Sequence, residues 1–154
     1  MHVFETKTVW QRGREFRVSA RENPDLVAAT PPAFGGPEGV WSPEEFLVAS
    51  VGGCLLSTLL YFAYRFDVPF DSCSSTSRGI VAKTSEGLRF TGLDVSIVVT
   101  VPDERAAEKA QSLRLKEKLE KYCPISASLN CPVRLALDIV PRPPERAATG
   151  GSAE

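Results

Sequence analysis

The alternation of apolar and polar residues predicts short strands near the start of the chain. Residues 6–20 form two such runs around a turn at Arg12-Gly13, and residues 25–29 form a third. Residues 30–41 contain three prolines and three glycines, which predicts a loop before the next element. We therefore expect a small β-structure that precedes a long apolar segment.

That apolar segment covers residues 46–64 and contains no charge. Ser42 as N-cap, Pro43 at the first helical position and Glu45 two residues later form a capping box, which predicts a helix from residue 43 to about 65. Because its apolar residues lie on nearly every side, we expect burial on nearly every side. A membrane span is disfavoured, since the run barely reaches the ~20 residues required and includes several small and hydroxyl residues.

The second half of the chain predicts a hairpin, helices and a last strand. Residues 72–83 and 88–101 read as a β-hairpin with a turn near residues 85–87, and residues 103–122 as one charged amphipathic helix. Pro124 at the first helical position makes Cys123 the N-cap of a short helix. Residues 132–140 alternate as a final strand, and residues 142–154 are expected to be a disordered tail.

This element order predicts one α+β domain over residues 1–141, with a mainly antiparallel sheet packed on a long buried central helix. The formal net charge is −1 and the chain has no basic block, so we expect no nucleic-acid partner. The first residues lack a basic stretch followed by an apolar one, so we expect no signal peptide, no membrane partner and a cytoplasmic location.

The cysteine and histidine content narrows the possible chemistry. The chain has four cysteines but one histidine, His2 at the terminus. A Cys-His or Ser-His-Asp nucleophile therefore lacks a base, and a histidine-containing zinc site is disfavoured. Cys123 and Cys131 are separated by eight positions, which fits no usual zinc spacing. We expect no metal and no cofactor, and any reactive thiol must be activated by a group other than imidazole.

Two cysteines occupy unusual positions. Cys54 follows Gly52-Gly53 inside the apolar helix, where each glycine costs about 1 kcal/mol relative to alanine and is tolerated when a backbone or ligand must come close. Cys123 lies at a helix N-terminus, where the helix dipole favours a thiolate. The alternative is that both are inert buried thiols and that the glycines serve helix packing. The residue pattern leaves both interpretations open.

The segments "SPEEFLVASVGGCLLSTLL" and "YCPISASL" resemble those of the OsmC/Ohr family, the osmotically inducible and organic-hydroperoxide-resistance proteins. The resemblance implies an intertwined homodimer with an active site at each subunit interface. It also implies that Cys54 attacks a peroxide, that Cys123 resolves the product as a disulfide, and that an external dithiol reduces this disulfide. The family's organic-hydroperoxide branch carries a "GGRDG"-like turn that this chain lacks, so the preferred substrate stays open.

The same resemblance matches Glu44 to the family's active-site glutamate, which holds an arginine of the first hairpin against the thiolate. Arg14 is our first candidate for this arginine and Arg12 the second, while Arg17 lies in the same segment. On a straight helix Glu44 and Cys54 are about 15 Å apart and differ by roughly 80° in direction, so they cannot touch. An arginine must bridge them, or a second subunit must bring the groups together.

The physical chemistry agrees with a cation beside Cys54. A free thiol has a pKa of about 8.5, and burial raises it, so an arginine is needed to keep the sulfur ionised. Apolar neighbours of Cys54 (Leu55, Leu59 and Phe62) suit an alkyl hydroperoxide better than hydrogen peroxide. Two other functions remain as alternatives. One is a non-catalytic protein of the same fold that binds an apolar ligand or partner, and the other is a general thiol–disulfide oxidoreductase, although no Cys-x-x-Cys motif is present.

Overall fold

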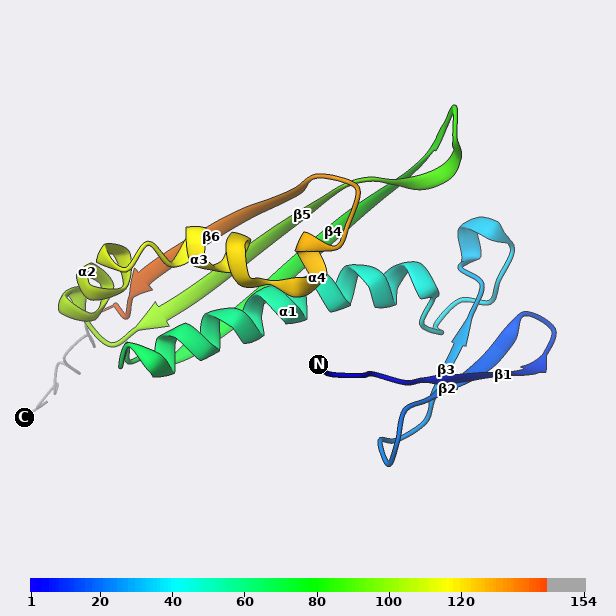
Figure 1. Cartoon of the computed structure of the whole chain (residues 1–154), viewed down its shortest axis with the longest axis horizontal. Helices are drawn as coiled ribbons and strands as arrows, with labels where there is room; N and C mark the ends of the chain where they lie inside the picture. Colours follow the sequence, from blue (N-terminus) through cyan, green and yellow to red (C-terminus); the bar gives the residue numbers. More distant parts are fainter. Residues whose placement is uncertain (144–154) are drawn as a thin grey trace, which may run out of the picture.

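The computed structural model describes residues 1–143, and the N-terminal part forms a three-stranded antiparallel sheet (Figure 1). Its strands are β1 (Lys7–Arg12), β2 (Glu15–Ser19) and β3 (Leu26–Ala29), in the order β1-β2-β3. The three strands were predicted correctly. The turn between β1 and β2 lies at Gly13 and Arg14, one residue later than expected, and Gly13 has a φ of 48° that favours glycine.

A second sheet contains β4 (Ser72–Thr84), β5 (Gly87–Val101) and β6 (Val133–Pro141), in the order β4-β5-β6. β4 and β5 form the predicted antiparallel hairpin, whereas β6 pairs with β5 in parallel. Antiparallel pairing therefore dominates, as expected, but not at β6. Since parallel neighbours need a crossover connection, the chain between β5 and β6 must return along the sheet, and it does so as helices.

The crossover begins with two helices, α2 (Glu104–Ser112) and α3 (Leu115–Tyr122), where one continuous helix was expected over residues 103–122. That prediction was wrong because the helix breaks at Arg114, which adopts a left-handed φ of 50°. The buried side of α2 contains Ala110, and continuing the helix by one turn would turn Arg114 inward. The break instead places Leu115 on the buried side of α3.

The crossover ends in α4 (Pro124–Ala127), a single helical turn. Cys123 is its N-cap, as predicted, and its side chain accepts a hydrogen bond from the backbone N–H of Ser126. Cys123 is completely buried. The remaining helical turn, η1 (Pro32–Phe34), lies inside the segment expected to be a loop.

The long helix α1 (Pro43–Arg65) begins with the predicted capping box. The Ser42 N–H donates to Glu45 Oε2 at 2.7 Å, and the Glu45 N–H donates to Ser42 Oγ at 3.2 Å. α1 packs against β4, and Gly52 allows the close approach, because a Cβ there would overlap Ser77 Oγ. Of the two adjacent glycines, Gly52 serves helix packing, which was one of the two interpretations of the Gly52-Gly53 pair.

α1 is not buried on nearly every side within one chain. One side packs on the sheet, while the opposite side leaves a row of small and aromatic residues exposed: Ala49, Ser50, Gly53, Ser57, Tyr61 and Tyr64. The expectation of general burial is therefore wrong for the single chain. In the described part of the chain, α1 is the one helix long and apolar enough to cross a membrane, a criterion that a core helix also meets.

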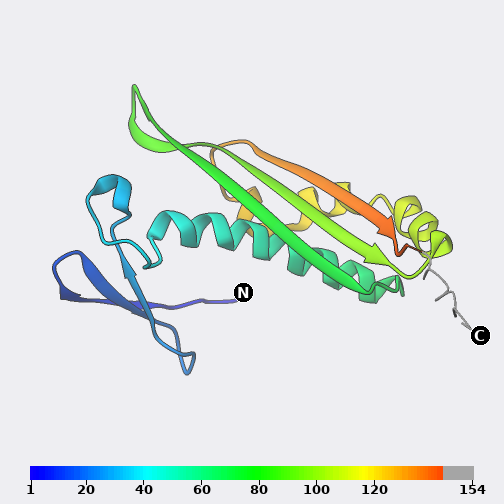
Figure 2. The ribbon, with the colours of Figure 1, turned by 180° about the vertical axis from the view of Figure 1, so that it is seen from behind.

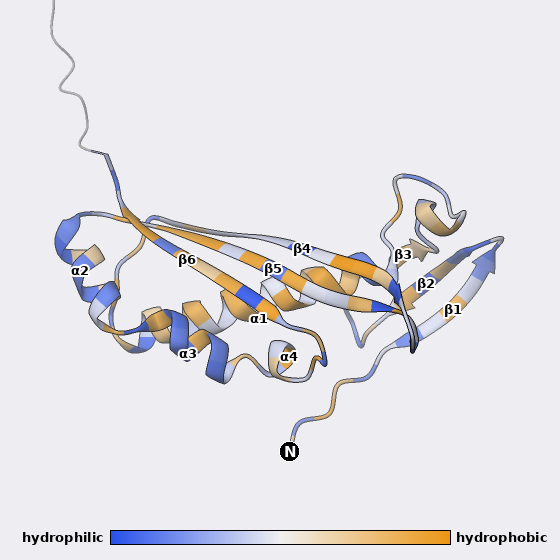
Figure 3. Ribbon diagram, turned by 90° about the horizontal axis from the view of Figure 1, so that it is seen from above, coloured by the Kyte–Doolittle hydropathy of each residue, from blue (hydrophilic) through white to orange (hydrophobic). Residues whose placement is uncertain are grey.

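The helices lie on one face of the second sheet, as the view from above shows (Figure 3). The core between them is formed by inward residues of β5 and by the buried residues of α1 to α3, including Val51, Leu55, Leu59, Leu93, Ile97, Leu115 and Leu119. The N-terminal sheet lies beyond the first turn of α1, away from this core (Figure 2). The predicted disordered tail, residues 142–154, falls almost wholly outside the described residues.

Candidate functional site

Cys54 and Cys123 come together where the middle of α1 meets the start of α4. Cys123 is fully buried and Cys54 half-buried. Burial raises the pKa of the Cys54 thiol, and the neighbouring Cys123 thiol raises it further. The structure therefore places the two sulfurs that sequence reasoning singled out next to each other, and both are free thiols.

The first turn of α4 directs backbone N–H groups at both sulfurs. The N–H of Ser126 donates to Cys123 Sγ at 3.4 Å, and the N–H of Ile125 interacts with the Cys54 thiol and lowers its pKa. The Thr58 hydroxyl, one turn after Cys54 on α1, donates to the Cys54 carbonyl oxygen at 2.8 Å, and it also lowers the pKa of the Cys54 thiol. These donors favour a thiolate, but burial outweighs them, so the pKa of Cys54 stays above its ordinary value in the single chain.

The hairpin arginines do not reach Cys54 within one chain. Arg14 donates to the carbonyl oxygen of Phe34, and Arg12 forms an ion pair with Glu15 at 3.0 Å. Arg17 pairs with Asp25 at 3.4 Å. All three lie in the N-terminal sheet or its turn, and none is among the groups that shift the pKa of Cys54. Residues 1–143 of a single chain therefore do not supply the expected cation.

Glu44 lies in the first turn of α1, half-buried, and it does not touch the cysteines. Its Oε2 atom is buried and has no hydrogen-bond partner among the described residues, and neither has the buried Ser75 Oγ of β4. A buried carboxylate oxygen without a donor is costly, so this arrangement is unsatisfied as it stands. Glu44 Oε2 can therefore accept a hydrogen bond from a donor that residues 1–143 do not provide.

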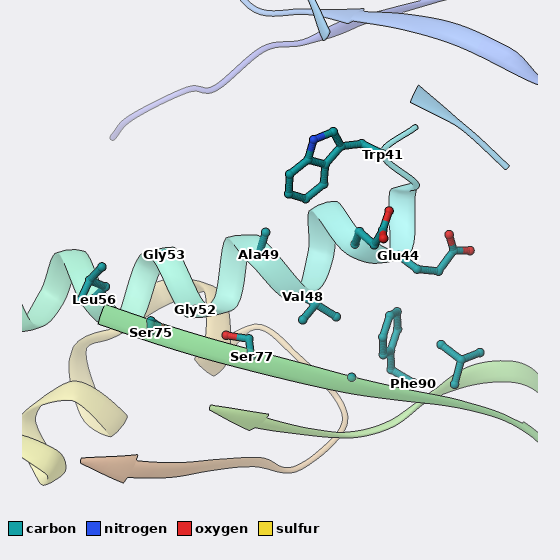
Figure 4. Close-up of a pocket in the computed structure, with 13 residues that line it drawn as sticks. Trp41, Glu44, Val48, Ala49, Gly52, Gly53, Leu56, Ser75, Ser77 and Phe90 are labelled. Atoms are coloured by element: carbon teal, nitrogen blue, oxygen red, sulfur yellow. The ribbon is translucent and has the colours of Figure 1, made fainter. Parts of the chain in front are cut away.

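Both unsatisfied atoms belong to residues that line a cavity of about 610 Å³ between the first half of α1 and the hairpin of β4 and β5 (Figure 4). We call it the serine-lined cavity. Its other walls are mostly apolar or small: Trp41, Val48, Ala49, Gly52, Gly53, Leu56, Ser77, Gly79, Val81 and Phe90. Neither Cys54 nor Cys123 lines it, so the serine-lined cavity and the thiol pair are separate features.

A second open cavity, of about 510 Å³, lies along the other half of α1. We call it the aromatic cavity. It is lined by Ser57, Thr58, Tyr61, Phe62, Arg65 and Tyr122. Thr58 connects this cavity to the thiol pair, because its side chain lines the one and interacts with Cys54 in the other.

Sequence reasoning missed several of these residues. The position of Thr58 beside Cys54 could have been predicted from the sequence, because residues four positions apart lie on the same face of a helix. The contributions of Ile125 and Ser126 come from backbone atoms, which no side-chain pattern reveals. Cys73 and Cys131, the two cysteines outside the thiol pair, are half-buried against the core, and burial raises the pKa of Cys73.

Comparison with known proteins identifies the fold. The family model described as OsmC-like protein matches residues 36–138. The solved structure of an OsmC-like protein of unknown function from Vibrio cholerae aligns over 91% of this chain and 100% of its own, with 18% identity and a TM-score of 0.79. A search of the curated proteins finds no significant match.

Two further solved structures carry functional names. An organic hydroperoxide resistance protein OsmC from Legionella pneumophila aligns over 91% of this chain and 98% of its own, at 23% identity and a TM-score of 0.69. An organic hydroperoxide resistance protein from Elizabethkingia anophelis aligns over 92% and 98%, at 20% identity and a TM-score of 0.67. At these identities the likeness shows a shared fold. Together with the family match over residues 36–138, it shows that this chain belongs to the OsmC-like protein family.

Proposed function

We propose that this protein is a thiol-dependent peroxidase that reduces organic hydroperoxides to alcohols through Cys54 and Cys123. The observation that carries the proposal is the contact between the two thiols, which come from distant parts of the chain. The names of the Legionella pneumophila and Elizabethkingia anophelis proteins point to the same chemistry.

The reaction divides into three balanced steps. The Cys54 thiolate attacks the peroxide, the O–O bond breaks, and the products are a Cys54 sulfenic acid and an alkoxide, which takes a proton to become the alcohol. The Cys123 thiol then condenses with the sulfenic acid, forming a disulfide and releasing water. An external dithiol reduces this disulfide by exchange and is itself oxidised to a disulfide.

The working form of the enzyme is a homodimer in the cytoplasm. Trp10 in β1 is 70% exposed and Tyr64 on α1 is 76% exposed, which is unusual for large apolar side chains. Ala49, Gly53 and Ser57 recur every four residues on the exposed side of α1, a spacing that lets two helices approach closely. A second copy would cover these surfaces and the isolated N-terminal sheet.

The second copy would also provide the missing cation. Arg12 and Arg17 already pair with carboxylates, whereas Arg14 donates to the backbone carbonyl of Phe34. Glu44 has a buried oxygen that lacks a donor among residues 1–143. We propose that Arg14 of one subunit pairs with Glu44 of the other and faces its Cys54, so that the guanidinium lowers the thiol pKa and stabilises the departing alkoxide.

A second candidate function is the binding of an apolar ligand without catalysis. The serine-lined cavity favours it, because Trp41, Val48 and Phe90 give its walls a mainly apolar character. In this case the thiols would be inert and the cavity would be the binding site. The two functions make opposite predictions for the cysteines, so one experiment separates them.

The test is treatment of the reduced protein with less than one equivalent of cumene hydroperoxide, followed by peptide mass spectrometry. We expect a Cys54–Cys123 disulfide and one equivalent of alcohol per disulfide. Cys54→Ser should consume no peroxide, while Cys123→Ser should accumulate the sulfenic acid, which dimedone traps. Cys73→Ser is the matched control and should behave as the wild type. Peroxide consumption that survives in Cys54→Ser, or the absence of the disulfide, would refute the proposal.

The dimer needs a separate test. An added Cβ at Gly53 meets nothing within 4 Å inside the chain, so Gly53→Leu places new bulk on the exposed side of α1 and should block helix contact between subunits. We expect this variant to be monomeric in light scattering and to lose peroxidase turnover. Gln111→Leu, on the exposed side of α2, is the control and should remain dimeric. A fully active Gly53→Leu monomer would contradict the shared active site.

A further inference from the structure

We propose that Thr58 is a positioning residue for Cys54: its hydroxyl turns from the Cys54 carbonyl oxygen to the Cys54 sulfur when the thiol loses its proton. This inference rests on the proposed peroxidase function, because it names the side chain that holds the nucleophile of the same site. Its basis is a hydroxyl that lies within reach of two acceptors on one residue.

The first step is the position of the Thr58 hydroxyl on α1. Thr58 follows Cys54 by four residues, so the two side chains lie one turn apart on the same face, and the Thr58 side chain leans back toward Cys54. Its Oγ1 donates to the Cys54 carbonyl oxygen at 2.8 Å, and it also interacts with the Cys54 thiol, whose pKa it lowers. A hydroxyl has a single proton to donate, so the carbonyl oxygen and the sulfur compete for it.

The second step compares the two acceptors. Inside an α-helix the N–H of residue 58 already donates to the carbonyl oxygen of residue 54, so the hydroxyl adds a second bond to an acceptor that is satisfied without it. A thiolate is a charged acceptor, and hydrogen bonds to charged groups are about twice as strong as neutral ones. The hydroxyl therefore gains by turning to the sulfur once the thiol has ionised. The thiol proton passes to solvent, and Thr58 keeps its own.

The third step considers the other groups around the sulfur. Burial and the Cys123 thiol oppose ionisation of Cys54, whereas the backbone N–H of Ile125 favours it. The elements that pack on α1 are β4, β5, α3 and α4, and within residues 1–143 none of them brings a charged side chain among the groups that shift the pKa of Cys54. Arg14 of a second subunit, as proposed above, would act in addition. Within the described chain, Thr58 is thus the side chain that donates to the sulfur.

The fourth step is the direction in which the sulfur is held. Thr58 lines the open aromatic cavity, whereas Cys54 does not. A thiolate that accepts from the Thr58 hydroxyl is therefore drawn toward the side on which α1 is open. A threonine that donates to the carbonyl four residues before it is also common in helices, and that bond alone would be purely structural. The two explanations differ because a purely structural bond does not respond to ionisation of Cys54.

The test measures the pH dependence of Cys54 alkylation by iodoacetamide, quantified by peptide mass spectrometry in the reduced protein. It compares the wild type with Thr58→Val, Thr58→Ser and Ser112→Ala. Valine keeps the shape of threonine without the hydroxyl, and serine keeps the hydroxyl without the methyl group. Ser112 is the matched control, because its hydroxyl donates to the Lys109 carbonyl oxygen at 2.7 Å on a different helix, α2. Thr58→Ala, which also lacks the hydroxyl, replaces Thr58→Val if that variant does not fold.

Thr58→Val should shift the midpoint of the alkylation profile to higher pH and slow alkylation near neutral pH by about threefold to tenfold, because a hydrogen bond to the thiolate is lost and water replaces part of it. Above that midpoint its rate should match or exceed the wild-type rate, since a more basic thiolate is more nucleophilic. Thr58→Ser should restore most of the wild-type profile, and Ser112→Ala should not change it. A wild-type midpoint in Thr58→Val, or a midpoint in Thr58→Ser as high as in Thr58→Val, would overturn the inference.

Peroxide reduction separates this inference from the proposed function. Near neutral pH, Thr58→Val should reduce cumene hydroperoxide more slowly in the same proportion as it is alkylated, because both reactions start from the thiolate. A slower peroxide reaction with an unchanged alkylation profile would also overturn the inference, because Thr58 would then act on the peroxide step instead of holding the thiolate. If the wild type consumes no hydroperoxide, the proposed function fails, while the alkylation profiles still decide whether Thr58 holds the sulfur.

Discussion

The Cys54 thiol on α1 contacts the Cys123 thiol at the start of α4, and the first backbone N–H groups of α4 face both sulfurs. The contact exists because the crossover between β5 and β6 returns to the middle of α1. The chain therefore supplies both sulfurs of the proposed cycle. In contrast, the hairpin arginines and Glu44 of the same chain are not among the groups that shift the pKa of Cys54.

Arg14 and Arg12 should differ sharply in their effect on Cys54. If Arg14 of one subunit faces Cys54 of the other, Arg14→Gln raises the thiol pKa, and near neutral pH the rate of peroxide reduction falls about tenfold for each pH unit of that shift. Arg12 is held by Glu15, so Arg12→Gln should change the rate by less than about twofold, the scale of an exposed pair. The pH dependence of iodoacetamide alkylation at Cys54 measures both. Equal profiles for the two variants would exclude Arg14 as the cation.

Gly52 should contribute to stability because it lets α1 approach β4 closely. A Cβ at this position would overlap Ser77 Oγ and lie 3.1 Å from Ser75 Oγ. We expect Gly52→Ala to lower the free energy of unfolding by about 1–2 kcal/mol in urea titration, since overpacking costs more than the gain in helix propensity. Adding Ser77→Ala removes the nearest atom and should restore most of the loss. No rescue would mean that the overlap lies elsewhere.

Cys73 should make stability depend on pH in the alkaline range. Burial raises its pKa above the ordinary value of 9.0, so the folded state holds the proton more tightly than the unfolded state does. The stabilisation is fully present below pH 9.0 and is lost as the pH rises through the folded-state pKa. The urea concentration at the midpoint of unfolding should therefore decrease more between pH 8 and pH 10 in the wild type than in Cys73→Ala. A parallel decrease in both proteins would show that Cys73 does not contribute.

Thermal unfolding should depend on protein concentration. Strands β1 to β3 do not pack extensively on the second sheet, and Trp10 is 70% exposed, so a second copy would stabilise them. For a dimer that dissociates on unfolding, Tm rises with concentration by mass action. Scanning calorimetry over a hundredfold range measures this. A wild-type Tm that does not change with protein concentration would contradict the dimer. The Tm of the Gly53→Leu variant, by contrast, should be independent of concentration.

The elements with strong local signals were predicted well from the sequence. Ser42, Pro43 and Glu45 define the start of α1 by themselves, and the alternation of residues 88–101 defines β5. The break at Arg114 was missed because the spacing of buried residues changes there by a single position, which an average over the whole segment hides. The parallel order of β6 was missed because pairing partners depend on the route of the chain rather than on local pattern.

For the site, the family resemblance rather than spacing pointed to Cys54 and Cys123, the two sulfurs that the fold brings together. Local chemistry predicted that Cys54 needs a cation, because burial raises the pKa of its thiol; the structure shows that burial effect, and the cation stays a prediction. Sequence could not identify that cation. Within residues 1–143 no donor reaches Glu44 Oε2 and no cation is among the groups that shift the pKa of Cys54. The aromatic cavity was missed because Tyr122 joins the α1 residues only through folding.

The crossover that carries Cys123 back to α1 has a consequence for the oxidised protein. A covalent bond between the two sulfurs would close a ring of about 70 residues that contains β4, β5, α2 and α3, and rings of this length restrict the unfolded chain by up to about 4 kcal/mol. Each turnover would then alternate between a tethered and an untethered fold. The oxidised form would resist proteolysis better than the reduced form, so in the proposed cycle the protein would last longer when peroxide is abundant than when reductant is abundant.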